Sequence, residues 1–271
     1  MSTYAYRLLK NLCFSERRIR DVLPRLSIRS FEAGDVIWSK GLPVQSWYCV
    51  MSGYVAASVP LENGAQLPIH IFGQHSWFGE QSLLSEQPAY MAYSCLTPVE
   101  VIGMDKAQLS AAFDDEPEFV RFLVSLVTRR VHQHSEMLML MRLGSSPLRA
   151  VMGLAQLAEA ASTAKKVRSD AHLAHVEVPI SQDLVAALCG ISRTLFSEFL
   201  QHLSRAGWVR LRYGAMDLIS PETWSAFAQH QRERKHVDKR PSIQDLLLEL
   251  QEASDQVAAA RALQQSPAWM V

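Results

Sequence analysis

The chain has 271 residues, of which 48% are hydrophobic and 20% are charged, with 12 glycines and 12 prolines. This composition excludes a disordered, collagen-like or repeat-dominated protein, and at about 100 to 200 residues per domain the length favours two domains. The 27 basic residues equal the 27 acidic ones, so whole-chain charge gives no argument for binding nucleic acid, a membrane or an acidic partner.

The cysteines and the apolar stretches favour a cytoplasmic protein without a membrane span. The uncharged stretch 41–61 contains Pro43 and Pro60 and is typical of strands and turns rather than of a transmembrane helix. Charged side chains interrupt the apolar N-terminal stretches, so we expect no secretory signal. No CxxC pair or clustered metal-ligand spacing links the four cysteines, which are Cys13, Cys49, Cys95 and Cys189.

The N-terminal half begins with helical spacing and then changes to short β-rich runs. Residues 4–25 predict one or two short helices, interrupted near Ser15. Between residues 30 and 104 the apolar runs are separated by glycine-containing turns, and strands at such regular spacing predict a compact β-roll. The predicted strands are 36–38, 47–51, 54–59, 68–72, 90–95 and 99–104.

After Asp105 the apolar period becomes helical again. The pattern predicts one long helix over residues 116–142. A helix this long extends beyond a domain of about 100 residues, so we expect its apolar stripe to form a dimer seam; the alternative is that the stripe packs only on the β-roll. Residues 144–147 then predict a break, followed by a helix over 148–161 and a polar loop over 162–175.

Residues 176–220 are the most informative segment. Ser181 and Ser192 are typical N-caps of two helices, over 182–188 and 193–206, with Gly190 in the turn between them and Gly207 after the second. Two helices joined by a short glycine-containing turn indicate a helix-turn-helix. Residues 208–211 and 216–219 around Tyr213-Gly214 predict a β-hairpin, the wing of a winged helix.

The second of these helices has an apolar face and a polar face. We expect the apolar face to point inward, and its members are Leu195, Phe196, Phe199, Leu200 and Leu203. The exposed face then consists of Arg193, Thr194, Ser197, Glu198 and Gln201.

The C-terminal part predicts a charged connector over 232–240 and an amphipathic helix over about 243–263. Its apolar residues are expected to pack on the protein itself, with a partner as the alternative. They are Leu246, Leu247, Leu248, Leu250, Val257 and Leu263.

The order of these parts resembles the cyclic-AMP receptor protein and FNR (Crp/Fnr) family of bacterial transcription factors over roughly residues 15–222. The matching pieces are Phe31-Glu32-Ala33-Gly34-Asp35-Val36-Ile37 with Gly41, Tyr48-Cys49-Val50-Met51-Ser52-Gly53-Tyr54-Val55, Gly73, Phe78-Gly79-Glu80 with Leu83-Leu84, and Cys189-Gly190-Ile191-Ser192-Arg193. The order and spacing of these pieces carry the resemblance.

The resemblance implies an α+β fold with a cyclic-nucleotide-binding-like sensor and a DNA-binding domain. The expected parts are a β-roll effector-sensing domain (1–115), a dimerisation helix (116–143), a winged helix-turn-helix (147–221) and a C-terminal helical extension (222–271). The implied partners are double-stranded DNA and a second copy of the chain. The loop 162–175 also takes the place where family members contact RNA polymerase.

One departure concerns the effector pocket, for which we select Gly79, Glu80, Tyr90 and Met91. Family members that bind cyclic nucleotides hold the phosphate with Arg and Ser about ten residues after Gly-Glu, where this chain has Tyr90 and Met91. No arginine occurs between Arg29 and Arg121, so a buried phosphate would lack its charge-assisted partner. We therefore predict no affinity for cyclic AMP or cyclic GMP. Residues 31–110 offer only Lys40 and Lys106 against Glu32, Asp35, Glu62, Glu80, Glu86, Glu100 and Asp105.

Other effectors are less well indicated, and the sequence identifies no cofactor. The scattered cysteines argue against an iron-sulfur cluster. Haem binding by His70 or His75 stays an alternative. A single histidine in such a roll is, however, more often a hydrogen-bonded polar side chain than a haem ligand. Aromatic side chains can line an apolar pocket, but filling of the core is the favoured interpretation. They are Trp38, Trp47, Trp77, Phe78 and Tyr90.

At the DNA-binding end, Arg193 is the best candidate for reading bases. Its planar fork can donate to guanine O6 and N7 together, a pairing worth about 1 to 3 kcal/mol of discrimination. Thr194 and Ser197 would make adaptable contacts, and Glu198 would accept from a cytosine amino group. Gln201 is a further expected DNA-binding residue on this face. Because the cyclic-nucleotide branch has another arginine in place of Glu198, we expect a different operator. The residues expected to contact phosphates are Ser181, Gln182, Arg210 and Arg212.

Competing functions remain open at this point. The charge of residues 145–220 is only slightly positive, which favours a second hypothesis: a sensory interaction module that has lost sequence-specific DNA binding. We find no Gly-rich phosphate loop, G-x-S-x-G elbow or H-E-x-x-H helix, so catalytic residues are not expected. His172 and His175 lack nearby further ligands, which argues against a metal site. The effector, the operator and the direction of regulation are not encoded in any recognisable motif.

Overall fold

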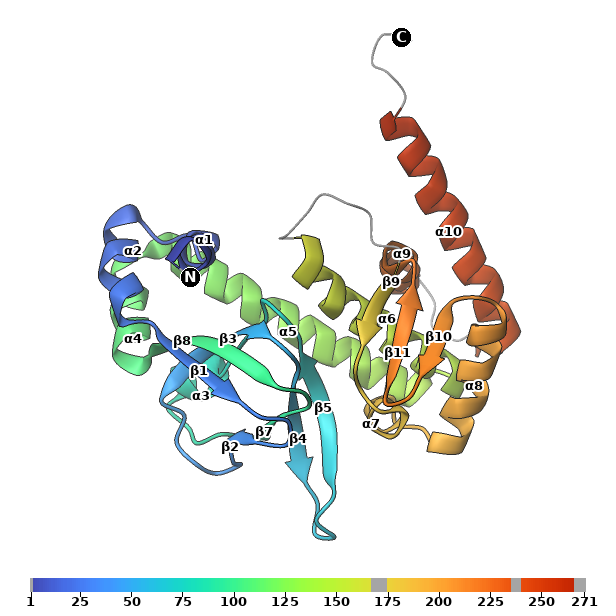
Figure 1. Cartoon of the computed structure of the whole chain (residues 1–271), viewed down its shortest axis with the longest axis horizontal. Helices are drawn as coiled ribbons and strands as arrows, with labels where there is room; N and C mark the ends of the chain where they lie inside the picture. Colours follow the sequence, from blue (N-terminus) through green and yellow to red (C-terminus); the bar gives the residue numbers. More distant parts are fainter. Residues whose placement is uncertain (1, 167–174, 235–239, 266–271) are drawn as a thin grey trace. The chain divides into compact units, whose positions relative to one another are not determined.

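The computed structural model describes residues 2–166, 175–234 and 240–265 (Figure 1). The chain divides into two compact units, residues 1–138 and 139–271, and each is described here by itself. The boundary lies inside a long helix, α5 (Pro117–Leu143). The finer division into four parts stays a prediction.

Two short helices precede the β-structure, as predicted. They are α1 (Ser2–Asn11) and α2 (Glu16–Val22), followed by the 3-10 turn η1 (Leu23–Arg25). Ser15 ends the interruption because its side chain accepts a hydrogen bond from the backbone N–H of Arg18 at 3.2 Å, which caps α2. Leu9 and Ile19 are buried and pack in the same core as Phe119 of α5.

The β-roll consists of two four-stranded antiparallel sheets (Figure 1). One has the order β1 (Ser27–Phe31), β8 (Val99–Asp105), β3 (Ser46–Ser52), β6 (Trp77–Phe78). The other has the order β2 (Val36–Trp38), β7 (Ala92–Cys95), β4 (Val55–Pro60), β5 (Gln66–Phe72). The six predicted strands are all present, with ends shifted by up to two residues.

Two strands of the roll were not predicted. The middle of β1 is exposed throughout, so its sequence lacks the alternation of a half-buried strand, and β6 has only two residues. Gly53 shows why glycine separates the strands: its φ is +84°, and an added Cβ would lie 2.2 Å from the carbonyl oxygen of Pro98.

Three helices complete unit 1. They are α3 (Glu80–Ser85), α4 (Lys106–Asp115) and α5. α4 was not predicted as a separate helix; Asp105 and Gln108 form a reciprocal capping box at its start. α5 extends over 27 residues, in agreement with the predicted long helix, and buries Phe119 and Leu123 in the core.

Unit 2 contains a helix-turn-helix and a three-stranded antiparallel sheet. The helices are α6 (Ser146–Lys166), α7 (Gln182–Leu188) and α8 (Arg193–Arg205). The sheet has the order β10 (Val209–Arg212), β11 (Ala215–Ile219), β9 (His175–Val178). The helix-turn-helix and wing are as predicted, whereas β9 adds an unpredicted third strand to the hairpin.

Two boundaries of unit 2 differ from the prediction. The break over 144–147 is shorter, because Ser146 and Pro147 already belong to α6 and proline suits the first turn of a helix. The loop predicted over 162–175 is helical as far as Lys166, and His175 begins β9. The rest of that loop, including His172, lies outside the described residues.

The C-terminal extension forms two helices, α9 (Pro221–Glu233) and α10 (Ile243–Gln265). α9 was not predicted, and its first residue, Pro221, is the last residue assigned to the wing domain. Leu246 and Leu250 of α10 are fully buried, which agrees with packing on the protein itself, whereas Leu248 is 67% exposed. Within the described ranges, no helix is both long enough and apolar enough to cross a membrane.

Candidate functional site

The turn between α7 and α8 is fixed by two serine caps and a glycine. The side chain of Ser181 accepts from the backbone N–H of Leu184 at 3.3 Å, and that of Ser192 accepts from Leu195 at 3.3 Å. Gly190 has a φ of +63°, and an added Cβ would lie 2.7 Å from the Sδ of Met141. A side chain at this position would therefore strain the turn and disturb its packing.

The amphipathic pattern of α8 places a polar ridge at the surface. Phe196, Leu200 and Leu203 are fully buried, and Phe199 is 8% exposed. Leu195 is half-buried, like Ser197 on the other face. The exposed members of the predicted ridge are Arg193, Thr194, Glu198 and Gln201.

Arg193 has a charged neighbour on the other helix. Its Nε lies 3.1 Å from Oδ1 of Asp183, and both side chains are more than half exposed. This ion pair joins the first turn of α7 to the first residue of α8. Arg193 thus has its recorded ion pair with α7 and not with Glu198 of its own helix.

The wing arginines surround a buried carboxylate. Asp217 of β11 is fully buried, with an Oδ2 oxygen 2.7 Å from Nη2 of Arg212 and 3.8 Å from Nη1 of Arg210. The arginine side chains are 45% and 64% exposed, respectively, so they neutralise this charge and still reach the surface. Tyr213 at the tip of the wing is fully exposed.

A second buried carboxylate lies in the β-roll. Glu80 at the start of α3 is fully buried and pairs with the guanidinium of Arg130 from α5. Arg130 also donates to the carbonyl oxygen of Trp77, and its guanidinium carbon lies 5.1 Å from the centre of the Phe72 ring. Trp47 donates from Nε1 to Glu80 at 3.2 Å. The roll therefore receives its buried cation from the long helix.

The predicted effector-pocket residues do not all face the interior. Gly79 packs closely under Trp38, since an added Cβ would lie 2.8 Å from that ring. Met91 is 6% exposed and belongs to the apolar core of the roll. Tyr90, in contrast, is 76% exposed beside Lys40 and does not face the interior of the roll, and its assignment to the pocket stays a prediction.

The other aromatic side chains fill the core, as the favoured interpretation predicted. Trp47 and Trp77 are stacked, with their ring centres 4.0 Å apart. Phe78 is fully buried within 5.5 Å of the Tyr93 ring centre. Trp38 is half-buried and stacks on Tyr48.

The two histidines of the roll have different surroundings. His75 is hydrogen-bonded through Nδ1 to the hydroxyl of Tyr4 at 2.9 Å. The ring centre of His70 lies 6.1 Å from that of His134 on α5. Burial, with the positive charge of Arg130 and the nearby His134, lowers the pKa of His70 to about 3, so the ring is neutral at physiological pH.

The buried thiols are poor nucleophiles and poor metal ligands. Burial raises the pKa of Cys95 to about 11 and that of Cys189 to about 12, and it raises the pKa of Cys49 as well. Cys13 is exposed. Among the described residues, no group of three or more His, Cys, Asp or Glu side chains is arranged to hold a metal ion.

One face of α5 carries exposed apolar side chains at heptad spacing. Val124, Val131 and Leu138 are 58%, 57% and 59% exposed, and each is seven residues from the next. The intervening d-type positions of the same repeat are Val127, His134 and Met141. This 3-4 alternation is the pattern of a coiled-coil seam.

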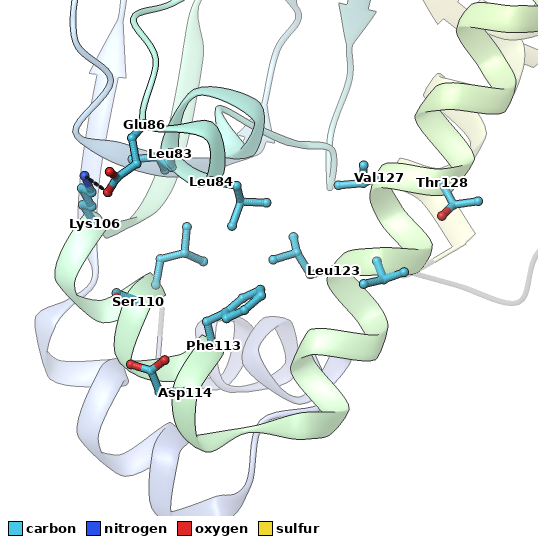
Figure 2. Close-up of a pocket in the computed structure, with 12 residues that line it drawn as sticks. Leu83, Leu84, Glu86, Lys106, Ser110, Phe113, Asp114, Leu123, Val127 and Thr128 are labelled. Atoms are coloured by element: carbon cyan, nitrogen blue, oxygen red, sulfur yellow. Dashed lines mark hydrogen bonds and ion pairs between the residues drawn. The ribbon is translucent and has the colours of Figure 1, made fainter.

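An apolar groove of about 500 Å³ lies between α3, α4 and the first half of α5 (Figure 2). Lys106 and Glu86 form an ion pair of 3.0 Å at its rim, and Leu84 and Phe113 are partly exposed inside it. The other lining residues are Leu83, Leu109, Ser110, Asp114, Leu123, Val124, Val127 and Thr128. Because the two valines among them, Val124 and Val127, belong to the heptad stripe, the groove adjoins the seam.

Comparisons with known proteins match both parts of this arrangement. The family model described as "Cyclic nucleotide-binding domain" matches residues 28–116. A CRP-like cAMP-activated global transcriptional regulator of Mycobacterium tuberculosis is 27% identical over 190 residues, covering 70% of this chain and 82% of the relative. The transcriptional regulator SdrP of Thermus thermophilus is 25% identical over 200 residues, covering 70% and 88%.

Solved structures support the same fold. FixK2 from Bradyrhizobium japonicum has a TM-score of 0.62 at 14% identity, covering 80% of this chain and 99% of that one. A CRP/FNR-family transcriptional regulator from Thermus thermophilus has a TM-score of 0.54 at 22% identity, covering 75% and 98%. At these identities the likeness concerns the fold alone.

Proposed function

Because the chain belongs to the Crp/Fnr family of transcription regulators, we propose that it binds double-stranded DNA as a homodimer, under the control of a signal sensed in the β-roll. The observation that carries this proposal is the serine-capped α7–α8 turn, which leaves a polar ridge with Arg193 at its start. A recognition helix reads base edges in the major groove with side chains near its N-terminus. The four parts predicted from the sequence, with bounds at 115, 143 and 221, are the domains we assign to these roles.

Base reading falls to α8 and phosphate binding to its neighbours. Arg193 would donate to guanine, with Thr194, Ser197, Glu198 and Gln201 beside it. Ser181 and Gln182 at the start of α7 and the wing arginines Arg210 and Arg212 would hold phosphates. Since Asp217 is neutralised by both wing arginines, the three side chains together carry a single net positive charge. Fewer released counterions make the salt dependence of binding shallow.

The dimer would form along α5. Three exposed apolar a-type positions at Val124, Val131 and Leu138 leave an apolar stripe that water covers in a monomer. Burying such a side chain is worth about 1.5 to 3 kcal/mol, so the stripe favours association with a second copy. The groove beside it would be covered in the same association. A two-fold dimer then presents two α8 helices to half-sites about one helical turn apart.

The proposed signal is not a cyclic nucleotide. The printed name of the Mycobacterium tuberculosis relative describes activation by cAMP, but this chain has Tyr90 and Met91 where nucleotide-binding members hold the phosphate. The cation of the roll, Arg130, is already engaged by Glu80 and by the Trp77 carbonyl. A phosphate would have to break that buried pair to gain a charge-assisted partner. RNA polymerase is a further proposed partner.

A DNA-binding experiment with one substitution tests the function. Genomic fragments retained by the purified full-length protein in the presence of excess unrelated duplex would be sequenced, and binding of an enriched fragment measured by fluorescence anisotropy. We expect Arg193→Ala to lose roughly fivefold to 140-fold in affinity for that fragment, in line with about 1 to 3 kcal/mol for a guanine contact. Unchanged binding by Arg193→Ala would favour the alternative of an interaction module without sequence-specific DNA binding.

A further inference from the structure

The carboxylate of Asp183 lies against one edge of the Arg193 guanidinium. The contact joins Nε to Oδ1 at 3.1 Å, while the side chains of Asp183 and Arg193 are 62% and 71% exposed. Exposed pairs of this kind contribute little to folding stability. Any consequence of the pair therefore concerns where the arginine points.

We propose that Asp183 is a positioning residue that orients Arg193 for guanine, an inference that rests on the proposed DNA-binding function. The guanidinium has three nitrogens in one plane, and Asp183 engages the one nearest the backbone. The recorded 3.1 Å contact is made by this Nε and not by a terminal nitrogen, Nη1 or Nη2. These are the nitrogens that can donate side by side to O6 and N7 of guanine.

The position of the pair fits this role. Asp183 is the second residue of α7, and Arg193 is the first residue of α8, so each is fixed by a helix start. Ser181 and Ser192 cap those two starts, and Gly190 holds the turn between them. A carboxylate on such a frame restricts the long arginine side chain before DNA arrives. Restricting a flexible side chain in advance removes part of the entropy cost of binding.

The restriction predicts selectivity rather than strength. An untethered Arg193 can turn to a phosphate, which carries no sequence information. Held by Asp183, it keeps its fork directed at one place, where only guanine presents two acceptors. The same carboxylate adds a negative charge near the DNA backbone, which weakens binding to every duplex alike. Neutralising Asp183 should therefore lower guanine preference and raise binding to unrelated DNA.

The test is a selection from random duplexes with the full-length protein and four variants. Arg193→Ala identifies the motif position that depends on the arginine. Asp183→Asn removes the carboxylate charge at nearly constant shape, and Asp183→Glu keeps a carboxylate. Glu252→Gln, at an exposed position of α10, is the matched control for loss of one negative charge.

We expect Asp183→Asn to reduce guanine preference at the Arg193-dependent position by roughly threefold to tenfold, the range expected for one immobilised side chain, with other positions unchanged. Asp183→Glu should retain most of the preference, and Glu252→Gln all of it. Undiminished guanine preference in Asp183→Asn overturns the inference, as does an equal loss at every motif position, which would indicate a structural role. If the unsubstituted protein enriches no motif, the proposed function fails and this inference fails with it.

Discussion

The buried pair between Arg130 and Glu80 offers a quantitative test of how the long helix is joined to the β-roll. Replacing Arg130 by Met removes the cation from a fully buried carboxylate and a donor from the Trp77 carbonyl. Removing one partner of a buried pair typically costs about 3 to 5 kcal/mol, because the remaining charge is uncompensated. We expect Arg130→Met to lower the free energy of unfolding of unit 1 by this amount.

Two further variants separate the pair from general effects of the substitution. Arg129 is the neighbouring arginine and is exposed, so Arg129→Met should change stability by less than about 0.5 kcal/mol. In the double variant Glu80→Gln/Arg130→Met the buried charge is gone, and the Gln side chain can still accept from Trp47. Because replacing both partners of a buried pair is often nearly neutral, the double variant should regain at least about 2 kcal/mol of the loss.

Urea unfolding followed by tryptophan fluorescence measures these differences. The stacked rings of Trp47 and Trp77 lie beside the pair and report on the roll. If Arg130→Met costs no more than Arg129→Met, or if the double variant is as unstable as Arg130→Met alone, the pair does not anchor α5 as described.

Three other predictions concern the seam, the buried histidine and the C-terminal helix. Val131→Glu should shift the protein from dimer to monomer in sedimentation velocity, whereas Ser125→Glu, at an exposed position off the seam, should not. A monomeric unsubstituted protein would contradict the proposal that α5 forms a dimer seam. The pKa of His70 is about 3 in the folded chain but near 6.5 in the unfolded chain. The contribution of the neutral His70 ring to folding stability is therefore complete above pH 6.5 and is lost as the pH falls toward 3. Lowering the pH from 7.5 to 5.5 should thus cost about 1.4 kcal/mol of unfolding free energy that His70→Gln does not lose, and an identical pH dependence in that variant would refute the assignment. Leu246→Ala should lower the free energy of unfolding, measured by thermal unfolding, by about 2 to 5 kcal/mol, because that side chain is fully buried. Leu248→Ala, at a 67% exposed site, should lower it by less than about 0.5 kcal/mol. Equal effects of the two substitutions would show that α10 does not pack as described.

Local signals account for what was predictable from the sequence. Ser181 and Ser192 cap helices through backbone groups three residues away, and Gly190 sets the local turn. The helix-turn-helix can therefore be predicted from the sequence without knowledge of the fold. The alternation of apolar residues likewise predicted six strands of the roll. Two strands have only a weak apolar alternation in the sequence. The middle residues of β1 are exposed, and β9 is held by pairing with β11.

The missed features depend on contacts between residues far apart in the chain. Arg130 neutralises Glu80, which lies 50 positions earlier in the chain. A count of charges within residues 31–110 therefore predicted a β-roll without an arginine, whereas the folded roll contains the guanidinium of Arg130. The available signal was an arginine within the apolar pattern of the long helix. Tyr90 was assigned to the pocket by position in a motif, but its side chain is exposed. The pairing of Arg193 with Asp183 likewise depends on how two helices meet.

Genome-wide footprinting of the DNA sites occupied by this protein in cells tests the proposed function most directly. A homodimer that reads DNA with α8 should occupy sites sharing an inverted repeat, with half-sites centred about 10 base pairs apart. Arg193→Ala should empty those sites at equal protein abundance. Occupied regions without any shared motif, or the same footprint from Arg193→Ala, would contradict sequence-specific recognition by this helix.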